Sequence, residues 1–241
     1  MLTPRSRREV ERRHTPSHGE LELVLDDEVE LPERSLAGRI GDGFKRLFDF
    51  SAALIGAIVL LPVFIVVAVA IKIDSPGPVF FAHRRLGRNG RHFDCLKFRT
   101  MQTDAERHVF ENEALRHHYV SNDFKIPQHI DPRITRLGAL LRKSSIDELP
   151  QLWNVLRGEM SLVGPRPIVA LEATHYGDRL PLLLSVRPGL TGLWAVAGRN
   201  LLGYPERADV ELSYVRERSL GMDLRILAST PWTVITQRGT I

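Results

Sequence analysis

The sequence has very little cysteine and no strong excess of one charge. Of its 241 residues only Cys95 is a cysteine, which excludes an intramolecular disulfide and a zinc site built from several cysteines. The formal charge of +4 is too small to indicate a nucleic-acid-binding protein. A P-loop, a G-x-G-x-x-G fingerprint and an H-E-x-x-H motif are also missing, so no ATP, NAD or zinc-protease site is predicted. No secretory cleavage pattern is present, which favours a reducing, cytosolic environment.

Charge is arranged in blocks within the first 40 residues. Residues 20–33 carry seven carboxylates and no basic side chain. Such blocks repel themselves and have no sustained apolar face. Residues 1–40 are therefore predicted to be a disordered, solvated extension, with an acidic docking tail as the alternative.

One apolar segment decides the class of protein. Residues 50–71 carry no charge, Ser51 is their only polar side chain, and 14 of these 22 residues are Leu, Ile, Val or Phe. These 14 side chains contribute about −4 to −8 kcal/mol toward membrane insertion. A straight helix of this length would measure about 33 Å, enough for a hydrocarbon core of ~30 Å. We therefore expect a membrane protein rather than a buried core helix.

Pro62 predicts a break within this segment, because proline cannot donate the helical hydrogen bond. Both ends are flanked by basic residues, Lys45 and Arg46 before and Lys72, Arg84, Arg85 and Arg88 after. Since cytoplasmic flanks attract Lys and Arg, both ends are expected on the same side of the membrane. We predict a re-entrant hairpin with helices over 47–61 and 63–73; a spanning helix is the alternative.

The rest of the chain predicts an α/β fold that is mostly helical, with a small β-hairpin. Strands are expected over 79–83 and 92–98, joined through Asn89-Gly90. Helices are expected over 102–119 and 133–143, with a loop over 121–132, and two more within 205–238, parted near Gly221. The basic face of helix 133–143 suits an anionic membrane surface, or is an ordinary solvated face. The predicted domains are an extension (1–40), a membrane segment (41–74) and a cytosolic catalytic domain (75–241).

The most informative stretch is 144–156. Ser145 and Glu148 match an S-x-x-E capping box; alternatively Asp147 caps the helix and Pro150 takes its third position. Either way Asp147 and Glu148 lie in the first turn of a helix, whose free N–H groups favour carboxylates and phosphates. One carboxylate can attack phosphorus while the other holds a cation such as Mg²⁺. Simple helix capping is the alternative.

Several cationic side chains lie in loops or at strand ends. Arg166 stands between two prolines, and Arg187 and Arg199 lie next to proline or glycine; Lys97 and Arg99 lie at the end of a predicted strand. Guanidinium groups bind phosphate oxygens bidentately. The set indicates an anionic substrate with several phosphates.

Taken in order, these motifs resemble one family over residues 43–238, the bacterial sugar transferases, which are monotopic phosphoglycosyl transferases. The motifs that carry the resemblance are Lys45-Arg46-x-x-Asp49, residues 97–101 (KFRTM), 131–135 (DPRIT), 145–151 (SIDELPQ), 164–167 (GPRP) and 187–192 (RPGLTG). The resemblance implies transfer of a sugar 1-phosphate from a UDP-sugar to undecaprenyl phosphate, with release of UMP. This is the first membrane step of exopolysaccharide, capsule or O-antigen synthesis.

The resemblance also implies roles for residues of this chain. Asp147 would be the nucleophile that forms a phosphosugar-aspartyl intermediate, and Glu148 with Asp147 would hold Mg²⁺ or, for Glu148, assist proton removal. Phosphate or nucleotide binding would fall to a set of cations: Arg142, Arg166, Arg187, Arg199, Lys97 and Arg99. Lys45 and Arg46 would lie at the headgroup level and Pro62 would break the re-entrant helix.

The expected location follows from these roles. It is the bacterial inner membrane with the catalytic domain on the cytosolic face, and no nucleic acid is expected as a partner. Partnership with other glycan-assembly enzymes and a homo-oligomer are compatible with the resemblance. The alternative function is a non-catalytic, membrane-anchored scaffold of a polysaccharide assembly complex.

Overall fold

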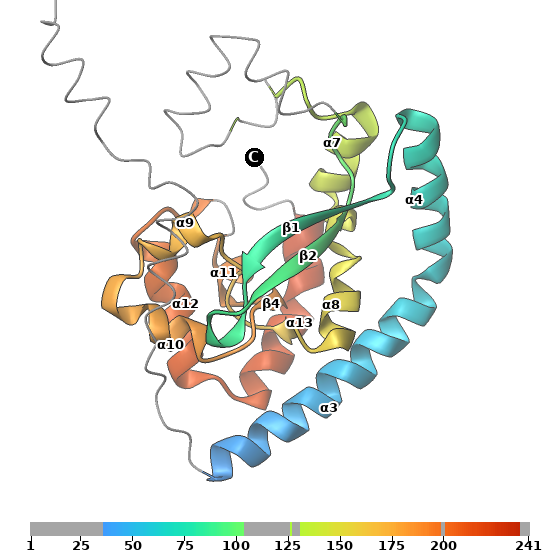
Figure 1. The fold of residues 1–241 in the computed structure, drawn as a ribbon. Coiled ribbons are helices and arrows are strands. Elements are labelled where there is room, and N and C mark those ends of the chain that lie inside the picture. The colour runs from blue at the N-terminus through green and yellow to red at the C-terminus, as the bar shows by residue number, and fades with distance from the viewer. Residues whose placement is uncertain (1–35, 104–125, 127–130, 199–200, 237–241) are drawn as a thin grey trace, which may run out of the picture.

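The fold is mostly helical and contains two small sheets (Figure 1). The computed structural model describes residues 36–103, 126, 131–198 and 201–236. The elements, in chain order, are α3 (Leu36–Val59), α4 (Leu61–Asp74), β1 (Phe80–Leu86), η1 (Arg88–Gly90), β2 (His92–Phe98), α7 (Arg136–Lys143), η2 (Ile146–Glu148), α8 (Gln151–Arg157), β3 (Ser161–Val163), α9 (Ala170–Ala173), η3 (Gly177–Arg179), α10 (Leu180–Leu184), β4 (Gly189–Thr191), α11 (Leu193–Ala197), α12 (Glu206–Glu217) and α13 (Leu220–Ile235). The predicted helical content and β-hairpin are confirmed, whereas the parallel pairing of β3 with β4 was not predicted.

Helices α3 and α4 form a bent arm along one side of the molecule (Figure 1). Within the described ranges, no single helix has both the length and the apolar composition to cross a bilayer; the two helices together do, with a bend of 59°. The Leu60 N–H still donates to Gly56 O, and the ladder resumes with Phe64 N–H to Leu60 O. Pro62 lies in the first turn of α4, where its missing N–H costs nothing. The predicted break is confirmed, but α3 already begins at Leu36, inside the segment predicted to be disordered.

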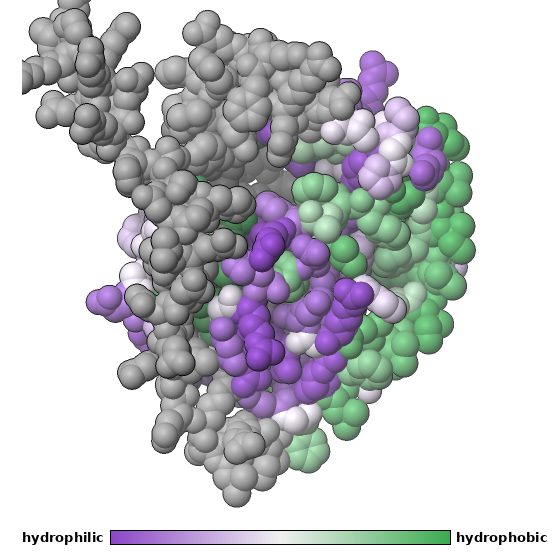
Figure 2. Space-filling view, viewed as in Figure 1, coloured by the Kyte–Doolittle hydropathy of each residue, from purple (hydrophilic) through white to green (hydrophobic). Residues whose placement is uncertain are grey.

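The outward side of this arm is apolar and exposed (Figure 2). Its inward side packs on the rest of the chain: Ala53 joins the main core, and Val67 and Ile71 pack with Phe98 and Leu141. An exposed apolar surface of this extent marks a membrane or partner contact. The exposed side chains are Leu47, Leu54, Ile55, Ile58, Val59, Leu61, Ile65, Val66, Val69 and Ile73.

Strands β1 and β2 form the predicted hairpin, in register from Phe80↔Phe98 to Leu86↔His92. The turn places Asn89 (φ 61°) and Gly90 (φ 73°) in the left-handed region, as an Asn-Gly hairpin requires. Strand β2 has its predicted bounds, whereas β1 runs three residues further than predicted because pairing continues up to the turn.

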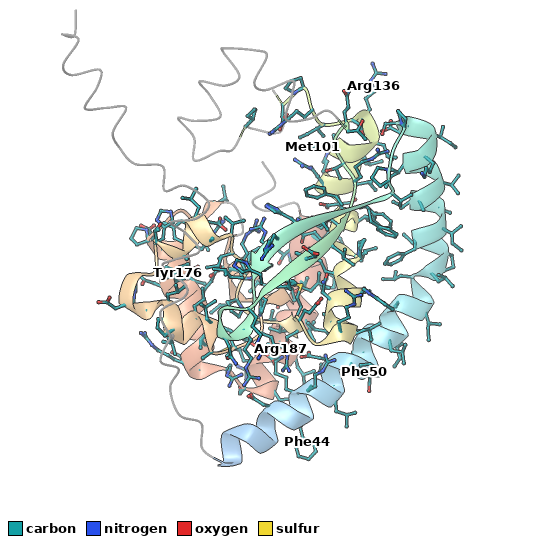
Figure 3. The ribbon with its side chains drawn as sticks, in the orientation of Figure 1. Phe44, Phe50, Met101, Arg136, Tyr176 and Arg187 are labelled. Atoms are coloured by element: carbon teal, nitrogen blue, oxygen red, sulfur yellow. The ribbon has the colours of Figure 1, made fainter. Side chains whose placement is uncertain are left out.

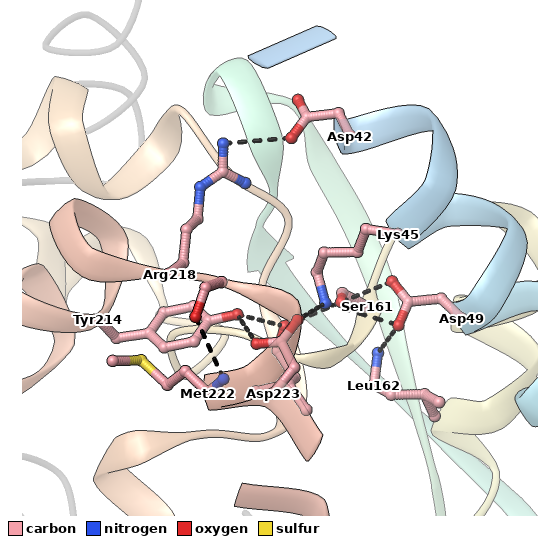
Figure 4. Close-up of polar contacts among 11 residues, drawn as sticks. Asp42, Lys45, Asp49, Ser161, Leu162, Tyr214, Arg218, Met222 and Asp223 are labelled. Atoms are coloured by element: carbon pink, nitrogen blue, oxygen red, sulfur yellow. Dashed lines mark hydrogen bonds and ion pairs between the residues drawn. The ribbon is translucent and has the colours of Figure 1, made fainter. Parts of the chain in front are cut away.

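A buried ion-pair network fastens α3 to the body of the protein (Figure 4). Lys45 Nζ lies 2.6 Å from Asp223 Oδ2 and 3.6 Å from Asp49 Oδ1. Asp49 accepts a 2.7 Å hydrogen bond from the Ser161 hydroxyl, and Asp223 accepts one of 2.8 Å from the Tyr214 hydroxyl. Lys45 and Asp49, the first and last residues of the Lys45-Arg46-x-x-Asp49 motif, therefore join α3 to β3 and α13, with Tyr214 of α12 in the same network.

Arg46 and Asp42 add to this attachment. The Arg46 guanidinium donates to Val155 O and, at 2.8 Å, to Leu156 O, which caps the last turn of α8. Asp42 Oδ1 lies 3.2 Å from Arg218. Lys45 and Arg46 thus have protein partners, and their predicted place at the headgroup level stays a prediction.

Other predicted elements differ in detail. Helix 133–143 begins at Arg136 instead, because the Thr135 hydroxyl caps it by accepting from the Gly138 N–H. The two C-terminal helices are confirmed, but the chain breaks at Arg218 and Ser219, so that Gly221 lies inside α13. The predicted helix 102–119 and loop 121–132 lie largely outside the described residues.

Candidate active site

Asp147 and Glu148 lie in η2, a 3-10 turn that precedes α8. The predicted capping box is wrong: Ser145 is in the left-handed region (φ 56°) and its side chain caps nothing. Helix α8 begins at Gln151 with Pro150 at its N-cap position, because proline cannot supply the next helical N–H. The two carboxylates therefore lie in the first turn of this short 3-10 helix and not in that of α8. Their electrostatic environment comes from neighbouring side chains.

Asp147 is a buried carboxyl group whose side chain is surrounded by charge. Its residue is 7% exposed. Burial raises the pKa of Asp147 from 3.8 to about 6; Lys97 and Arg142 oppose this, and Glu148 adds to it. A carboxyl group with this pKa is mostly ionised near neutral pH and lies out of bulk water, as a nucleophile requires.

Glu148 points to a different environment. Its Oε1 lies 2.7 Å from Lys97 Nζ, and both side chains are about one-quarter exposed. Glu148 and Lys97 line a surface pocket, whereas the neighbouring Asp147 is buried beside it. The adjacent carboxylates are thus placed to divide roles.

Arg142 reaches Asp147 because α7 lies tightly against the end of β2. Arg142 Nε donates 2.8 Å to Thr100 Oγ1, and Thr135 N–H donates to Thr100 O. A Cβ added to Gly138 would lie 2.0 Å from Thr100 O, so only glycine permits this approach. Burial lowers the pKa of Arg142, and Asp147 is the first of the charges that oppose this effect.

The pocket beside Glu148 concentrates positive charge. Arg85, Lys97 and Arg166 face a single carboxylate, Glu148. The Arg166 guanidinium lies 5.2 Å from the Trp194 ring centre. An anion with more than one negative charge would reduce the electrostatic repulsion among these three cations. The remaining lining residues are Cys95, Gln151, Pro167, Gly189, Leu190 and Trp194.

Glycines bring two predicted phosphate-binding loops together at this pocket. Gly164 N–H donates 2.9 Å to Thr191 O, and Gly189 N–H donates 2.8 Å to Pro165 O. A Cβ on Gly189 would lie 2.1 Å from Gly164 N, and one on Gly192 would lie 2.0 Å from Gly164 O. The 164–167 and 187–192 motifs therefore form one unit, which sets Arg166 at the pocket.

The structure separates two other predicted cations, Arg99 and Arg187, from this site. Arg99 donates 2.7 Å to Ser75 O and also to Pro76 O, where α4 ends. Arg187 donates 2.7 Å to Gly158 O and lines a second pocket, with Lys45 and Asp49. In Figure 3, Arg187 lies at the end of the molecule that carries Phe44 and Phe50, away from Met101. Arg199 lies outside the described residues.

Arg85 was missed as a site residue. Its sequence position predicted a place in the basic flank of the membrane segment, but β1 directs it into the pocket. The signal was present: alternate residues of a strand face the same way, and the register pairs His83 with Cys95, which puts 83, 85, 95 and 97 on one face of the hairpin.

The donor set at η2 fits a hard cation that also binds substrate. Within the described ranges, no cluster of three or more His, Cys, Asp or Glu could hold a metal ion. Mg²⁺ commonly uses one or two carboxylates and takes its other ligands from substrate phosphates and water. Asp147 and Glu148 can supply that pair.

Comparisons with known proteins identify the family of this chain. Residues 40–237 match the family model described as bacterial sugar transferase. Exopolysaccharide production protein ExoY of Rhizobium meliloti is 42% identical over 213 residues, covering 87% of this chain and 94% of that protein. Undecaprenyl-phosphate galactose phosphotransferase of Salmonella typhimurium is 38% identical over 91% of this chain and 47% of its own. UDP-glucose:undecaprenyl-phosphate glucose-1-phosphate transferase of Xanthomonas campestris is 39% identical, and the match covers 80% of this chain and 39% of that protein.

Proposed function

This chain belongs to the bacterial sugar transferase family and is a phosphoglycosyl transferase, and we propose that it transfers a sugar 1-phosphate from a UDP-sugar to undecaprenyl phosphate. The observation that carries the proposal is the buried Asp147 carboxyl beside a pocket lined by Arg85, Lys97 and Arg166. The names of two relatives specify galactose and glucose phosphate transfer to that lipid.

In the first step, a carboxylate oxygen of Asp147 attacks the sugar-bearing phosphorus of the UDP-sugar. The phosphoanhydride bond to the other phosphorus breaks and UMP leaves with that electron pair. An aspartyl phosphosugar remains on the protein. Arg142 and Lys97 hold the carboxylate ionised before the attack, and the pocket cations balance charge on the departing phosphate.

In the second step, a phosphate oxygen of the lipid attacks the same phosphorus. The bond between Asp147 and phosphorus breaks, which restores the carboxylate and yields the lipid diphosphate sugar. Because both substrates use the nucleophile in turn, ping-pong kinetics are expected.

Asp147 and Glu148 would hold Mg²⁺ with the substrate phosphates. When bound, the ion would neutralise charge on the phosphate oxygens and make the phosphorus more electrophilic. Lys97 pairs with Glu148 at 2.7 Å, so it keeps that carboxylate directed at the pocket.

We place the reaction at the cytosolic surface of the inner membrane. One substrate is a soluble nucleotide and the other a lipid, so the nucleophile must lie where water meets bilayer. The exposed apolar side of α3–α4 supports insertion, and the 59° bend supports a re-entrant course in which both ends stay on one side.

The test is turnover by the full chain in detergent or nanodiscs. UDP-galactose and UDP-glucose, each labelled in the sugar, are supplied with Mg²⁺ and undecaprenyl phosphate. We expect release of UMP and label in the lipid, both lost in Asp147→Asn and retained in Asp209→Asn, a change at an exposed carboxylate. Donor alone should leave a phosphosugar mass on the peptide that contains residue 147. Normal turnover by Asp147→Asn would overturn the nucleophile, and no turnover with any UDP-sugar would favour a scaffold.

A further inference from the structure

Arg85 is held at the pocket by contacts from three elements. Its Nη1 donates 3.1 Å to Pro167 O and lies 3.4 Å from Glu172 Oε2. Its Nη2 lies 3.1 Å from Nδ1 of His83, two residues earlier on the same face of β1. Both terminal nitrogens are therefore fixed.

His83 can only accept in this contact. A guanidinium has no acceptor, so Nδ1 of His83 must carry the lone pair and the ring proton must lie on Nε2. A charged imidazolium would place a second donor against Arg85. The contact therefore requires neutral His83.

The surroundings keep His83 neutral. The charged or titratable groups that face it are Arg85 on its own strand, Lys97 and the cross-strand Cys95 on β2, Arg166 before α9, and Glu172 on α9. Burial and then Arg85 and Lys97 lower the pKa of His83 to about 4, against a smaller opposing effect of Glu172. His83 is thus no acid or base near neutral pH.

We infer that His83 is a positioning residue that fixes the Arg85 guanidinium so that it binds a phosphate of the nucleotide donor. This inference rests on the proposed function. Glu172 already offsets part of the Arg85 charge. A second carboxylate at position 83 would also hold Arg85 but would offset more of that charge, whereas a neutral acceptor orients the guanidinium and removes no further charge. Fixing a long side chain before binding also reduces the entropy lost when the ligand arrives.

The test measures binding of UDP to the full chain in detergent with Mg²⁺, by calorimetry, because the donor sugar is not identified. Arg85→Met should weaken binding about 10- to 100-fold, the range for a charge-assisted hydrogen bond. His83→Leu should weaken it about 5- to 10-fold, through a misplaced Arg85. His83→Gln, whose amide oxygen can accept from Arg85, should stay within about twofold of wild type.

The double variant His83→Leu/Arg85→Met gives the decisive readout. If His83 acts through Arg85, the double variant binds UDP like Arg85→Met alone, within about twofold. Three results would each overturn the inference. The losses of UDP affinity in the two single variants could multiply in the double variant, His83→Leu could bind UDP as well as wild type, or His83→Gln could bind it as weakly as His83→Leu. His83→Phe replaces His83→Leu should the latter not fold. Failure of wild type to bind UDP or turn over would instead reject the proposed function.

Discussion

Lys97 Nζ lies 2.7 Å from Glu148 Oε1, and the same ammonium is the strongest of the charges that lower the pKa of the neighbouring Asp147. One side chain thus orients the second carboxylate and keeps the first ionised. In Lys97→Met, Asp147 should take up its proton at higher pH. The acid limb of the pH profile for single-turnover UMP release should therefore move upward from about pH 6. Lys97→Arg, which keeps the charge, should leave the limb in place. A limb that stays fixed in both variants would contradict this electrostatic role.

Asp147→Asn should make the protein more stable, in a pH-dependent way. The folded-state pKa of Asp147 is raised from 3.8 to about 6, so the ionised carboxylate costs folding free energy above that range. The cost is full above the folded pKa and disappears as pH falls toward the unfolded value. We expect a gain on the order of 2 kcal/mol, or about 5 °C in Tm, near pH 8 and none near pH 4. Scanning fluorimetry at several pH values measures it; an equal gain at every pH would contradict the burial of this charge.

Lys45→Met should destabilise the protein. It leaves Asp223 and Asp49 buried without their cation, and breaking one side of a buried pair is costly. We expect a loss of about 2–3 kcal/mol, a fall in Tm of roughly 5–10 °C. Arg179→Gln is the matched control, because its pair with Asp209 is 42% and 63% exposed and should cost less than about 1 kcal/mol. Equal losses would show that the α3 network adds no more than a surface pair.

Gly138→Ala should displace α7 and lower both stability and activity. The new Cβ would lie 2.0 Å from Thr100 O, which is backbone and cannot turn aside, and Arg142 moves with the helix. We expect a loss of about 2 kcal/mol or more, together with a fall in kcat of tenfold or more, on the order of the effect of misplacing a positioned group. Gly43→Ala in α3, with nothing within 4 Å, should be neutral or stabilising. Thermal melts and single-turnover rates distinguish the two glycines.

The proposed re-entrant course predicts that residues at both ends of the α3–α4 arm react with a labelling reagent from the same side of the membrane. Cysteines placed at Gly43 and Asp74, both exposed, are treated with a membrane-impermeant maleimide in spheroplasts and in inverted vesicles. We expect both to react only in inverted vesicles. The native Cys95 is buried, and burial raises its pKa to about 11, so it should stay silent and serve as the control. Labelling of the two sites from opposite sides would mean that the arm spans the bilayer.

Local chemistry was enough to predict some elements. Pro62 acts on its own helix and Asn89-Gly90 on its own turn, so both features were visible in a few consecutive residues. Asp147 and Glu148 stood out for the same reason, but the conformation of the turn that carries them was not predicted. Ser145 adopts a left-handed conformation that breaks the expected capping box, and no local pattern signals that choice.

The role of each arginine depends on backbone groups that are distant in the sequence. Arg99 and Arg187 have the same local character as Arg166, yet Arg99 binds the end of α4 and Arg187 binds Gly158 O. Their partners are carbonyl groups, which every residue carries, so sequence cannot single them out. Arg85 was recoverable in principle, because its strand position puts it on the same face of the β1–β2 hairpin as Lys97.

The α3–α4 arm also completes the interior of the protein. Ala53 at 0% and Ile71 at 2% exposure are as deeply enclosed as any residue of the body, and each belongs to a cluster shared with it. Cutting the chain after Asp74 would open both clusters to solvent. A water-soluble fragment that begins at residue 75 should therefore collapse or aggregate. Whatever the outer side of the arm contacts, its inner side is part of the protein's core.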